Sequence, residues 1–175
     1  LGLEENTLVM FLSDNGGCAE FLAEDSSQPE PLKYSQPTRN GRPMRIGNSP
    51  AIRPGPDDTF MSYDLPWANA SNAPFRLFKH WLHEGGSATP FIFHWPNGIE
   101  EGRIETGYYA HVKDIMPTCL DLAGASYPLE HRGYPIQSID GRSLMPNLSG
   151  DTSENTETLY LEHEGNRAVR RGKWK

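Results

Sequence analysis

Asp14 and Asn15 place a carboxylate and an amide directly after an apolar run and before two glycines. The run covers residues 8–12, Leu-Val-Met-Phe-Leu, and five consecutive apolar residues suit a strand buried on both faces of a parallel sheet. Ligands bind outside the carboxyl ends of such strands, and a carboxylate and an amide carbonyl are the kind of oxygen ligand that Ca²⁺ or Mg²⁺ takes. Gly16 and Gly17 would let the backbone turn sharply there. Asp-Asn-Gly is also a common turn sequence, so an Asx turn without a metal is the alternative.

The other side chains with reactive or metal-binding chemistry are two cysteines and several histidines. Cys119 lies among apolar residues and is expected in the core, whereas Cys18 follows the glycines with no base beside it. Two cysteines make neither a disulfide framework nor a zinc pattern. The histidines at positions 80, 83 and 94 are expected to pack or to lie at the surface. Residues 111–114 are expected to cap a helix.

Composition narrows the class of protein further. The 175 residues carry a formal net charge of −7, without a basic tract, which argues against a nucleic-acid-binding surface. No apolar run is long enough to span a bilayer. The sequence starts without Met, and residues 1–6 resemble the end of a helix, so we expect a segment of a longer protein.

Five segments must position the candidate residues. Residues 18–73 lack periodicity and are rich in Pro, Gly, Asn and Ser, so they form either a solvated loop or a lid that faces a substrate. Residues 89–96 predict a second buried strand, and residues 111–123 predict a helix. Residues 158–164 and 167–175 predict two antiparallel strands around a Gly-Asn turn.

The predicted helix has an apolar stripe and a glycine at its end. Gly124 suits the C′ position, and Pro117 is tolerated in the first turn. The stripe, which we expect to face the core, consists of Val112, Ile115, Met116, Cys119, Leu120 and Leu122.

These elements predict an α/β fold with a mostly parallel sheet, followed by a small antiparallel subdomain. We place the α/β core at residues 1–150, including the long segment 18–73. The antiparallel subdomain begins at residues 151–175.

Three sequence segments occur in an order that resembles the sulfatase family, specifically arylsulfatases of the alkaline phosphatase superfamily. They are the strand followed by Ser-Asp-Asn-Gly-Gly, the segment from Lys79 to Glu84-Gly85-Gly86 that leads into a strand ending in Trp-Pro, and the helix of residues 114–124. Residues 61–76 and 168–175 fit the same pattern. The resemblance therefore covers nearly the whole chain, and it implies part of an alkaline-phosphatase-like core.

The resemblance implies roles for three residues. Asp14 and Asn15 match two of the oxygen ligands of the family's divalent cation, usually Ca²⁺ and sometimes Mg²⁺. Lys79 matches the family's lysine, whose ammonium can hold a sulfate oxygen and offset charge as the ester bond breaks. The substrate implied is an aryl or carbohydrate sulfate, and family members are often periplasmic, secreted or lysosomal.

Departures from the family pattern limit this expectation. Sulfatases use a formylglycine made within Cys/Ser-x-Pro/Ala-x-Arg, and neither Cys18 nor Cys119 lies in that motif. The paired aspartates that complete the metal site are also missing. We therefore expect the C-terminal part of a sulfatase, inactive alone, with its nucleophile outside this chain. The alternatives are a phosphoester or phosphonate hydrolase of the same superfamily and a nonhydrolytic homologue that binds carbohydrate or metal.

Overall fold

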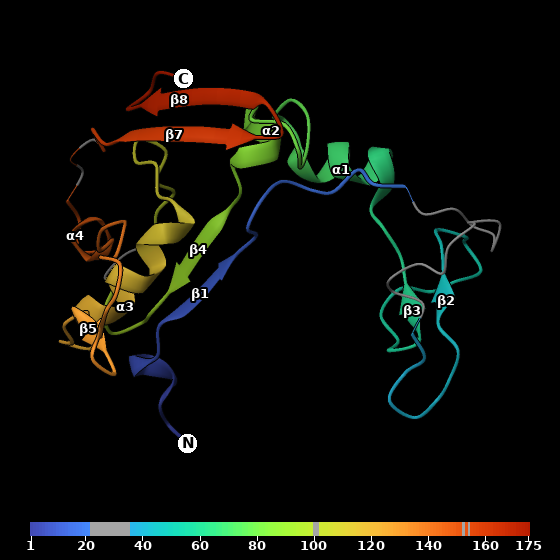
Figure 1. Ribbon diagram of the computed structural model, residues 1–175, viewed down its shortest axis with the longest axis horizontal. Helices are drawn as coiled ribbons and strands as arrows, with labels where there is room; N and C mark the ends of the chain where they lie inside the picture. Colours follow the sequence, from blue (N-terminus) through green and yellow to red (C-terminus); the bar gives the residue numbers. More distant parts are fainter. Residues whose placement is uncertain (22–35, 100–101, 152, 154) are drawn as a thin grey trace. The chain divides into compact units, whose positions relative to one another are not determined.

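A computed structural model describes residues 1–21, 36–99, 102–151, 153 and 155–175 (Figure 1). The chain divides into two compact units. Unit 1 comprises Leu1–Leu12, Phe91–Leu161 and Ala168–Lys175, and unit 2 comprises Ser13–Pro90 and Glu162–Arg167.

Strand β1, Val9–Leu12, pairs with β4, Phe91–His94, in an antiparallel sheet of unit 1. The two predicted strands therefore form, but the predicted mostly parallel sheet is wrong for the part of the chain that the structure describes. Its sheets there are all two-stranded, and β2 (Arg45–Ile46) with β3 (Thr59–Phe60) is the parallel pair. The unbroken apolar run suggested a strand buried on both faces, but the residues of β1 alternate between exposed and half-buried.

The predicted helix of residues 111–123 is confirmed in unit 1. It begins as the short 3₁₀ helix η2, Val112–Asp114, and continues as α3, Ile115–Leu122. The predicted cap is present: His111 Nδ1 accepts from the Lys113 N–H at 3.2 Å, and Asp114 Oδ2 accepts from the His111 N–H at 2.8 Å. Gly124, with φ of 60°, follows the helix in the left-handed conformation expected at C′.

The helix buries a polar face rather than the predicted apolar stripe. Val112 and Met116 are more than half exposed, and Cys119, expected in the core, is exposed. The buried residues are Asp114 and Thr118. Asp114 and Thr118 are able to lie in the interior because their polar atoms form hydrogen bonds there.

Those partners come from the segment before α4, Met145–Leu148. Asp114 Oδ1 accepts from the Arg142 N–H at 3.0 Å, and the Leu144 N–H donates to the Thr118 hydroxyl oxygen at 2.9 Å. The Thr118 hydroxyl donates in turn to the Asp114 carbonyl at 2.6 Å. Helices α3 and α4 are therefore linked by these hydrogen bonds beside the buried Leu144 side chain.

The C-terminal hairpin is present, with its turn one residue earlier than predicted. Strands β7, Thr158–His163, and β8, Asn166–Arg171, run in opposite directions (Figure 1). Glu164 and Gly165 occupy the turn with φ angles of 49° and 83°. Positive φ at both central residues matches a type I′ turn, which suits the twist of a two-residue hairpin. A smaller hairpin joins β5 (Glu130–His131) to β6 (Tyr134–Pro135).

Residues 18–73 belong to unit 2, and the described part of this segment is more structured than predicted. It includes the β2–β3 pair and the helix α1, Asp64–Asn72, while residues 22–35 lie outside the described part. The short helix α2, Glu84–Ser87, follows. Near the N-terminus, Glu4–Asn6 form a single 3₁₀ turn, η1.

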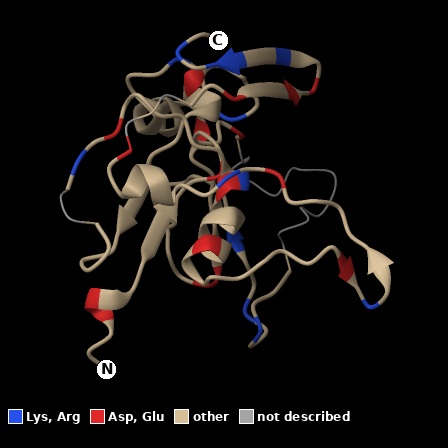
Figure 2. Ribbon diagram, turned by 90° about the vertical axis from the view of Figure 1, so that its left-hand side faces the viewer, with Lys and Arg blue, Asp and Glu red and all other residues tan. Residues whose placement is uncertain are grey.

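Charged residues are interspersed along the described elements. Figure 2 shows Lys and Arg scattered among Asp and Glu over the described elements, in keeping with the mixed charges of the sequence. Among the described residues, no helix combines the length and apolar character needed to cross a membrane.

Candidate active site

The turn that carries Asp14 and Asn15 is fastened to α2 by backbone contacts in unit 2. The Gly16 N–H donates to the Gly86 carbonyl at 3.0 Å. One residue before the turn, the Ser13 carbonyl accepts from the Thr89 hydroxyl at 2.8 Å. Segments 70 or more residues apart in the sequence therefore meet at this turn.

The glycines at this junction are required for close packing. Their φ angles are not positive, so the turn does not depend on the glycine-specific backbone expected for Gly16 and Gly17. A Cβ on Gly16 would lie 1.8 Å from the Gly85 carbonyl oxygen, and one on Gly85 would lie 2.0 Å from the Leu77 carbonyl oxygen. A Cβ on Gly86 would lie 2.0 Å from the Trp81 carbonyl oxygen. The Gly-Gly pairs are therefore contact surfaces between backbones.

Asn72, the last residue of α1, connects the Asp14 turn to the segment that carries Lys79. Its Oδ1 accepts from the Gly17 N–H at 2.9 Å, and its Nδ2 donates to the Leu77 carbonyl at 3.1 Å. The Lys79 N–H donates directly to the Gly17 carbonyl at 3.0 Å. Sequence reasoning missed Asn72, because its role is to hold distant backbone groups and no local spacing signals that.

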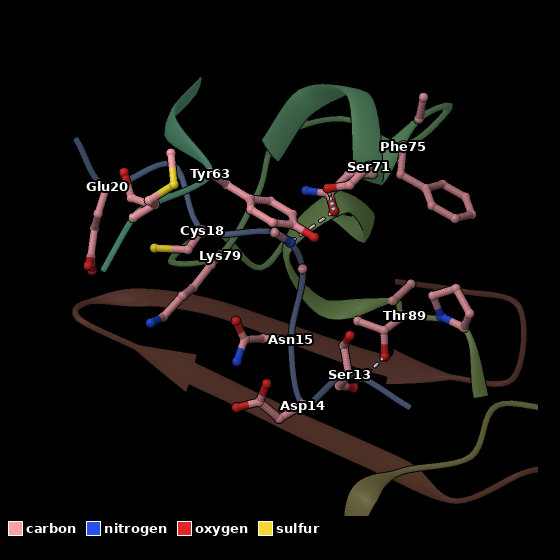
Figure 3. A pocket seen from close by; sticks show the side chains of 18 of the residues that line it. Ser13, Asp14, Asn15, Cys18, Glu20, Tyr63, Ser71, Phe75, Lys79 and Thr89 are labelled. Atoms are coloured by element: carbon pink, nitrogen blue, oxygen red, sulfur yellow. Dashed lines mark hydrogen bonds between the residues drawn. The ribbon is translucent and has the colours of Figure 1, made fainter. Parts of the chain in front are cut away.

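Asp14, Asn15 and Lys79 line one pocket of unit 2, with a volume of about 660 Å³. Their side chains extend to the same side of the pocket in Figure 3. Asp14 and Lys79 are exposed and Asn15 is half-buried. The remaining wall includes residues of the long segment, among them Cys18 and Tyr63. The three residues selected from sequence thus lie together, although their chemical roles stay predictions.

The donor set of this pocket fits a hard divalent cation. Among the described residues, the side chains of Asp14 and Asn15 have no hydrogen-bond or ion-pair partner, so their oxygens are available as ligands. Two oxygens are fewer than the six to eight that Ca²⁺ takes, so further ligands must come from elsewhere. The Lys79 ammonium forms no ion pair with a described residue and is available to an anion.

Two arginines of the long segment are already paired. Arg42 forms ion pairs with Asp57 and Asp58, and Arg45 contacts Asp58 at 3.3 Å. These pairs hold the region around β2 and β3 together. The two guanidinium groups are therefore engaged locally.

The long segment contains a serine match to the family's formylglycine motif. Ser49-Pro-Ala-Ile-Arg53 fits Ser-x-Ala-x-Arg. Ser49 does not line the pocket, and its hydroxyl oxygen accepts from the Ala51 N–H at 3.3 Å. Its placement outside the pocket agrees with a turn residue rather than a nucleophile.

Comparison with known proteins gives a consistent family. A model of the sulfatase family matches residues 1–125. An uncharacterized sulfatase of Schizosaccharomyces pombe is 29% identical over the whole chain, the arylsulfatase of Klebsiella aerogenes is 31% identical over 82% of it, and human arylsulfatase A is 30% identical over the whole chain. The chain spans 30%, 28% and 25% of the length of these three relatives.

Proposed function

Because this chain belongs to the sulfatase family, we propose that it forms part of a sulfuric ester hydrolase and supplies part of its active site. The observation that carries the proposal is the pocket that brings Asp14, Asn15 and Lys79 together. The substrate class is a sulfate monoester of a phenol or a sugar. Five relatives are called arylsulfatase or steryl-sulfatase, which supports hydrolysis of a sulfate ester.

Asp14 and Asn15 would hold a divalent cation, Ca²⁺ or Mg²⁺, together with ligands from outside this chain. When bound, the cation supplies positive charge that polarises the sulfate group. Asp14 carries a negative charge that repels a sulfate anion when no cation is present. The pocket is therefore suitable for a sulfate anion only when a bound metal ion neutralises the Asp14 carboxylate.

Lys79 would bind the sulfate group from another side of the pocket. Its ammonium donates hydrogen bonds to a sulfate oxygen and offsets the negative charge that develops on the bridging oxygen as the S–O bond breaks. The formylglycine nucleophile that the family uses would come from outside this chain. The chain by itself is then inactive.

The wider organisation follows from the same assignment. Residues 1–150 would belong to the α/β core of the enzyme, and residues 151–175 would begin an antiparallel subdomain. The β7–β8 hairpin supports the second part. The part of segment 18–73 that lines the pocket would contact the alcohol or phenol side of the substrate.

The experiment that tests this proposal is Asp14→Ala in the protein that contains this chain. We expect hydrolysis of 4-nitrophenyl sulfate to fall by at least about 100-fold, as when an electrostatic group of an active site is removed, and metal content to fall with it. Ser49→Ala serves as the control and should keep wild-type activity. Unchanged activity in Asp14→Ala would contradict the assignment, and faster hydrolysis of 4-nitrophenyl phosphate than of the sulfate would identify a phosphoester hydrolase instead.

A further inference from the structure

A second group of side chains with metal-binding chemistry lies in unit 2 and shares no residue with the Asp14 pocket. It consists of His80, which follows Lys79, and of His163 and Glu164 at the turn of the β7–β8 hairpin. One ligand atom from each of the three residues lies within 4.8 Å of the other two. We propose that these three residues form a binding site for Zn²⁺.

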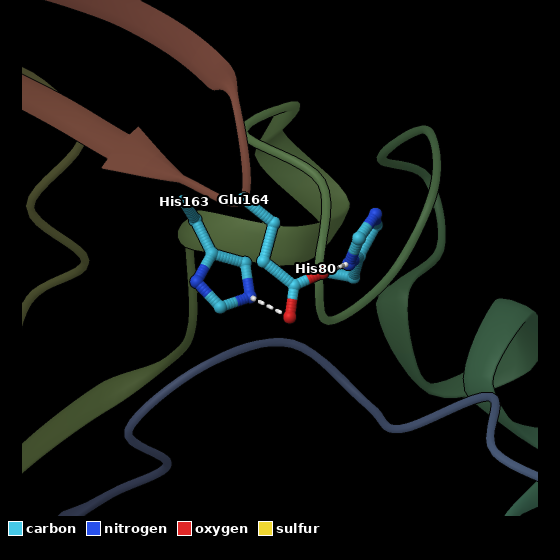
Figure 4. Close-up of side chains that lie close together, drawn as sticks. All are labelled: His80, His163 and Glu164. Atoms are coloured by element: carbon cyan, nitrogen blue, oxygen red, sulfur yellow. Dashed lines mark ion pairs between the residues drawn. The ribbon is translucent and has the colours of Figure 1, made fainter.

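The three side chains lie close to the arrangement that three ligands of one metal ion would have. Glu164 lies between the two imidazole rings in Figure 4, with Oε2 at 2.9 Å from His80 Nδ1 and Oε1 at 4.0 Å from His163 Nε2. Ligand atoms bound to a tetrahedral zinc ion at about 2.0–2.1 Å lie about 3.3–3.4 Å apart. All three side chains are exposed, so His163 is able to close the remaining gap by rotating its side chain.

The backbone has positive φ angles at two of the ligands. His80 has φ of 92°, a region that residues other than glycine rarely occupy, whereas the φ of 49° at Glu164 is that of the type I′ turn. The Trp81 ring also packs edge-on against the His80 ring, with centroids 5.1 Å apart. This ring contact restrains the imidazole of His80.

The donor set selects the class of metal. Two imidazole nitrogens and one carboxylate suit Zn²⁺ and similar transition metals, whereas Ca²⁺ and Mg²⁺ prefer oxygen ligands alone. Three protein ligands leave a fourth position for water. An ion held here would join the hairpin turn to the residue that follows Lys79, and so would restrain the segment that presents the Lys79 ammonium.

The test measures zinc binding by the metal-stripped protein that contains this chain. Zn²⁺ is titrated at neutral pH against a chromophoric chelator, with excess Ca²⁺ present to occupy oxygen sites. We expect His80→Asn, His163→Asn and Glu164→Gln each to weaken zinc binding at least about tenfold. The matched control is His83→Asn, an exposed histidine of the same segment that lies outside the cluster, and it should bind zinc as the wild type does.

A second measurement uses the wild-type protein and does not depend on the folding of variants. The imidazole NMR signals of His80 and His163 should shift on addition of Zn²⁺, and Co²⁺ should give the visible absorption of a tetrahedral site. Equal zinc affinity in the wild type and in all three variants would overturn the proposal and leave only an ion pair. Imidazole signals that do not respond to Zn²⁺ would overturn it as well.

Discussion

Lys79 is positioned through its backbone, which leaves its ammonium available. The Lys79 N–H is bound to the Gly17 carbonyl, and Asn72 holds both Gly17 and Leu77. The alkyl chain is exposed and ends at the pocket. Removal of the ammonium therefore changes the charge of the pocket without removing a contact that supports the fold.

Lys79→Ala tests this separation of charge from structure. In the protein that contains this chain, we expect kcat for 4-nitrophenyl sulfate to fall by about 100-fold or more, because a group that offsets developing charge is lost. The thermal midpoint should stay close to that of the wild type, since the backbone bond to Gly17 does not need the side chain. Steady-state kinetics and a thermal melt measure the two effects. A kcat of Lys79→Ala equal to that of the wild type would show that Lys79 is not part of the proposed site.

At the scale of elements, the Asp14 turn and α2 form a single packed junction. Gly16 packs against the Gly85 carbonyl oxygen, and Gly85 and Gly86 of α2 pack in turn against the carbonyl oxygens of Leu77 and Trp81. The glycines therefore set how closely the turn, α2 and the segment of Lys79 approach one another. The distance between the proposed cation ligands and Lys79 therefore depends on residues that carry no functional group.

Gly16→Ala should disturb this junction. The added methyl group would lie 1.8 Å from the Gly85 carbonyl oxygen, and overpacking of this kind costs about 1–3 kcal/mol. Chemical denaturation should show that loss in the free energy of unfolding. Gly102→Ala is the matched control, because its Cβ would meet nothing within 4 Å, and it should change stability by less than about 0.5 kcal/mol. Equal free energies of unfolding for Gly16→Ala and Gly102→Ala would show that the junction accommodates the added methyl group without loss of stability.

Local sequence patterns predicted which segments become strands and helices, but not how they pair. The apolar run at residues 8–12, the capped helix at 111–123 and the hairpin were visible because neighbouring residues determine them. The direction of β1 against β4 was not, since an apolar run suits either pairing. The link made by Asn72 joins groups 55 residues apart, and such contacts leave no local signal.

At the scale of the whole chain, unit 1 depends on polar contacts that titrate. Lys113 forms an ion pair with Glu157, and its hydrogen bond and charge lower the pKa of the Glu157 carboxyl below its usual value of 4.5. A lowered folded-state pKa means that the pair stabilises the fold above about pH 4.5 and that this contribution is lost as the pH falls further.

Glu157→Gln should therefore lower the thermal midpoint at pH 7 and have a smaller effect at pH 3, because the wild-type carboxylate is protonated as the pH falls. Thermal melts of both proteins across this range give the difference directly. Glu130→Gln, at an exposed strand position, is the control and should follow the wild type at every pH. A difference between Glu157→Gln and the wild type that stays constant with pH would show that the ion pair does not contribute.

The two-stranded β1–β4 sheet has a consequence for the behaviour of the chain in solution. Each strand has one partner among the described residues, and Phe11 and Ile92 are more than half exposed on them. Free strand edges that carry apolar side chains are templates for pairing with other chains. Produced as a separate polypeptide, this chain should accordingly self-associate as its concentration rises. We expect it to aggregate in storage under conditions in which it is still folded.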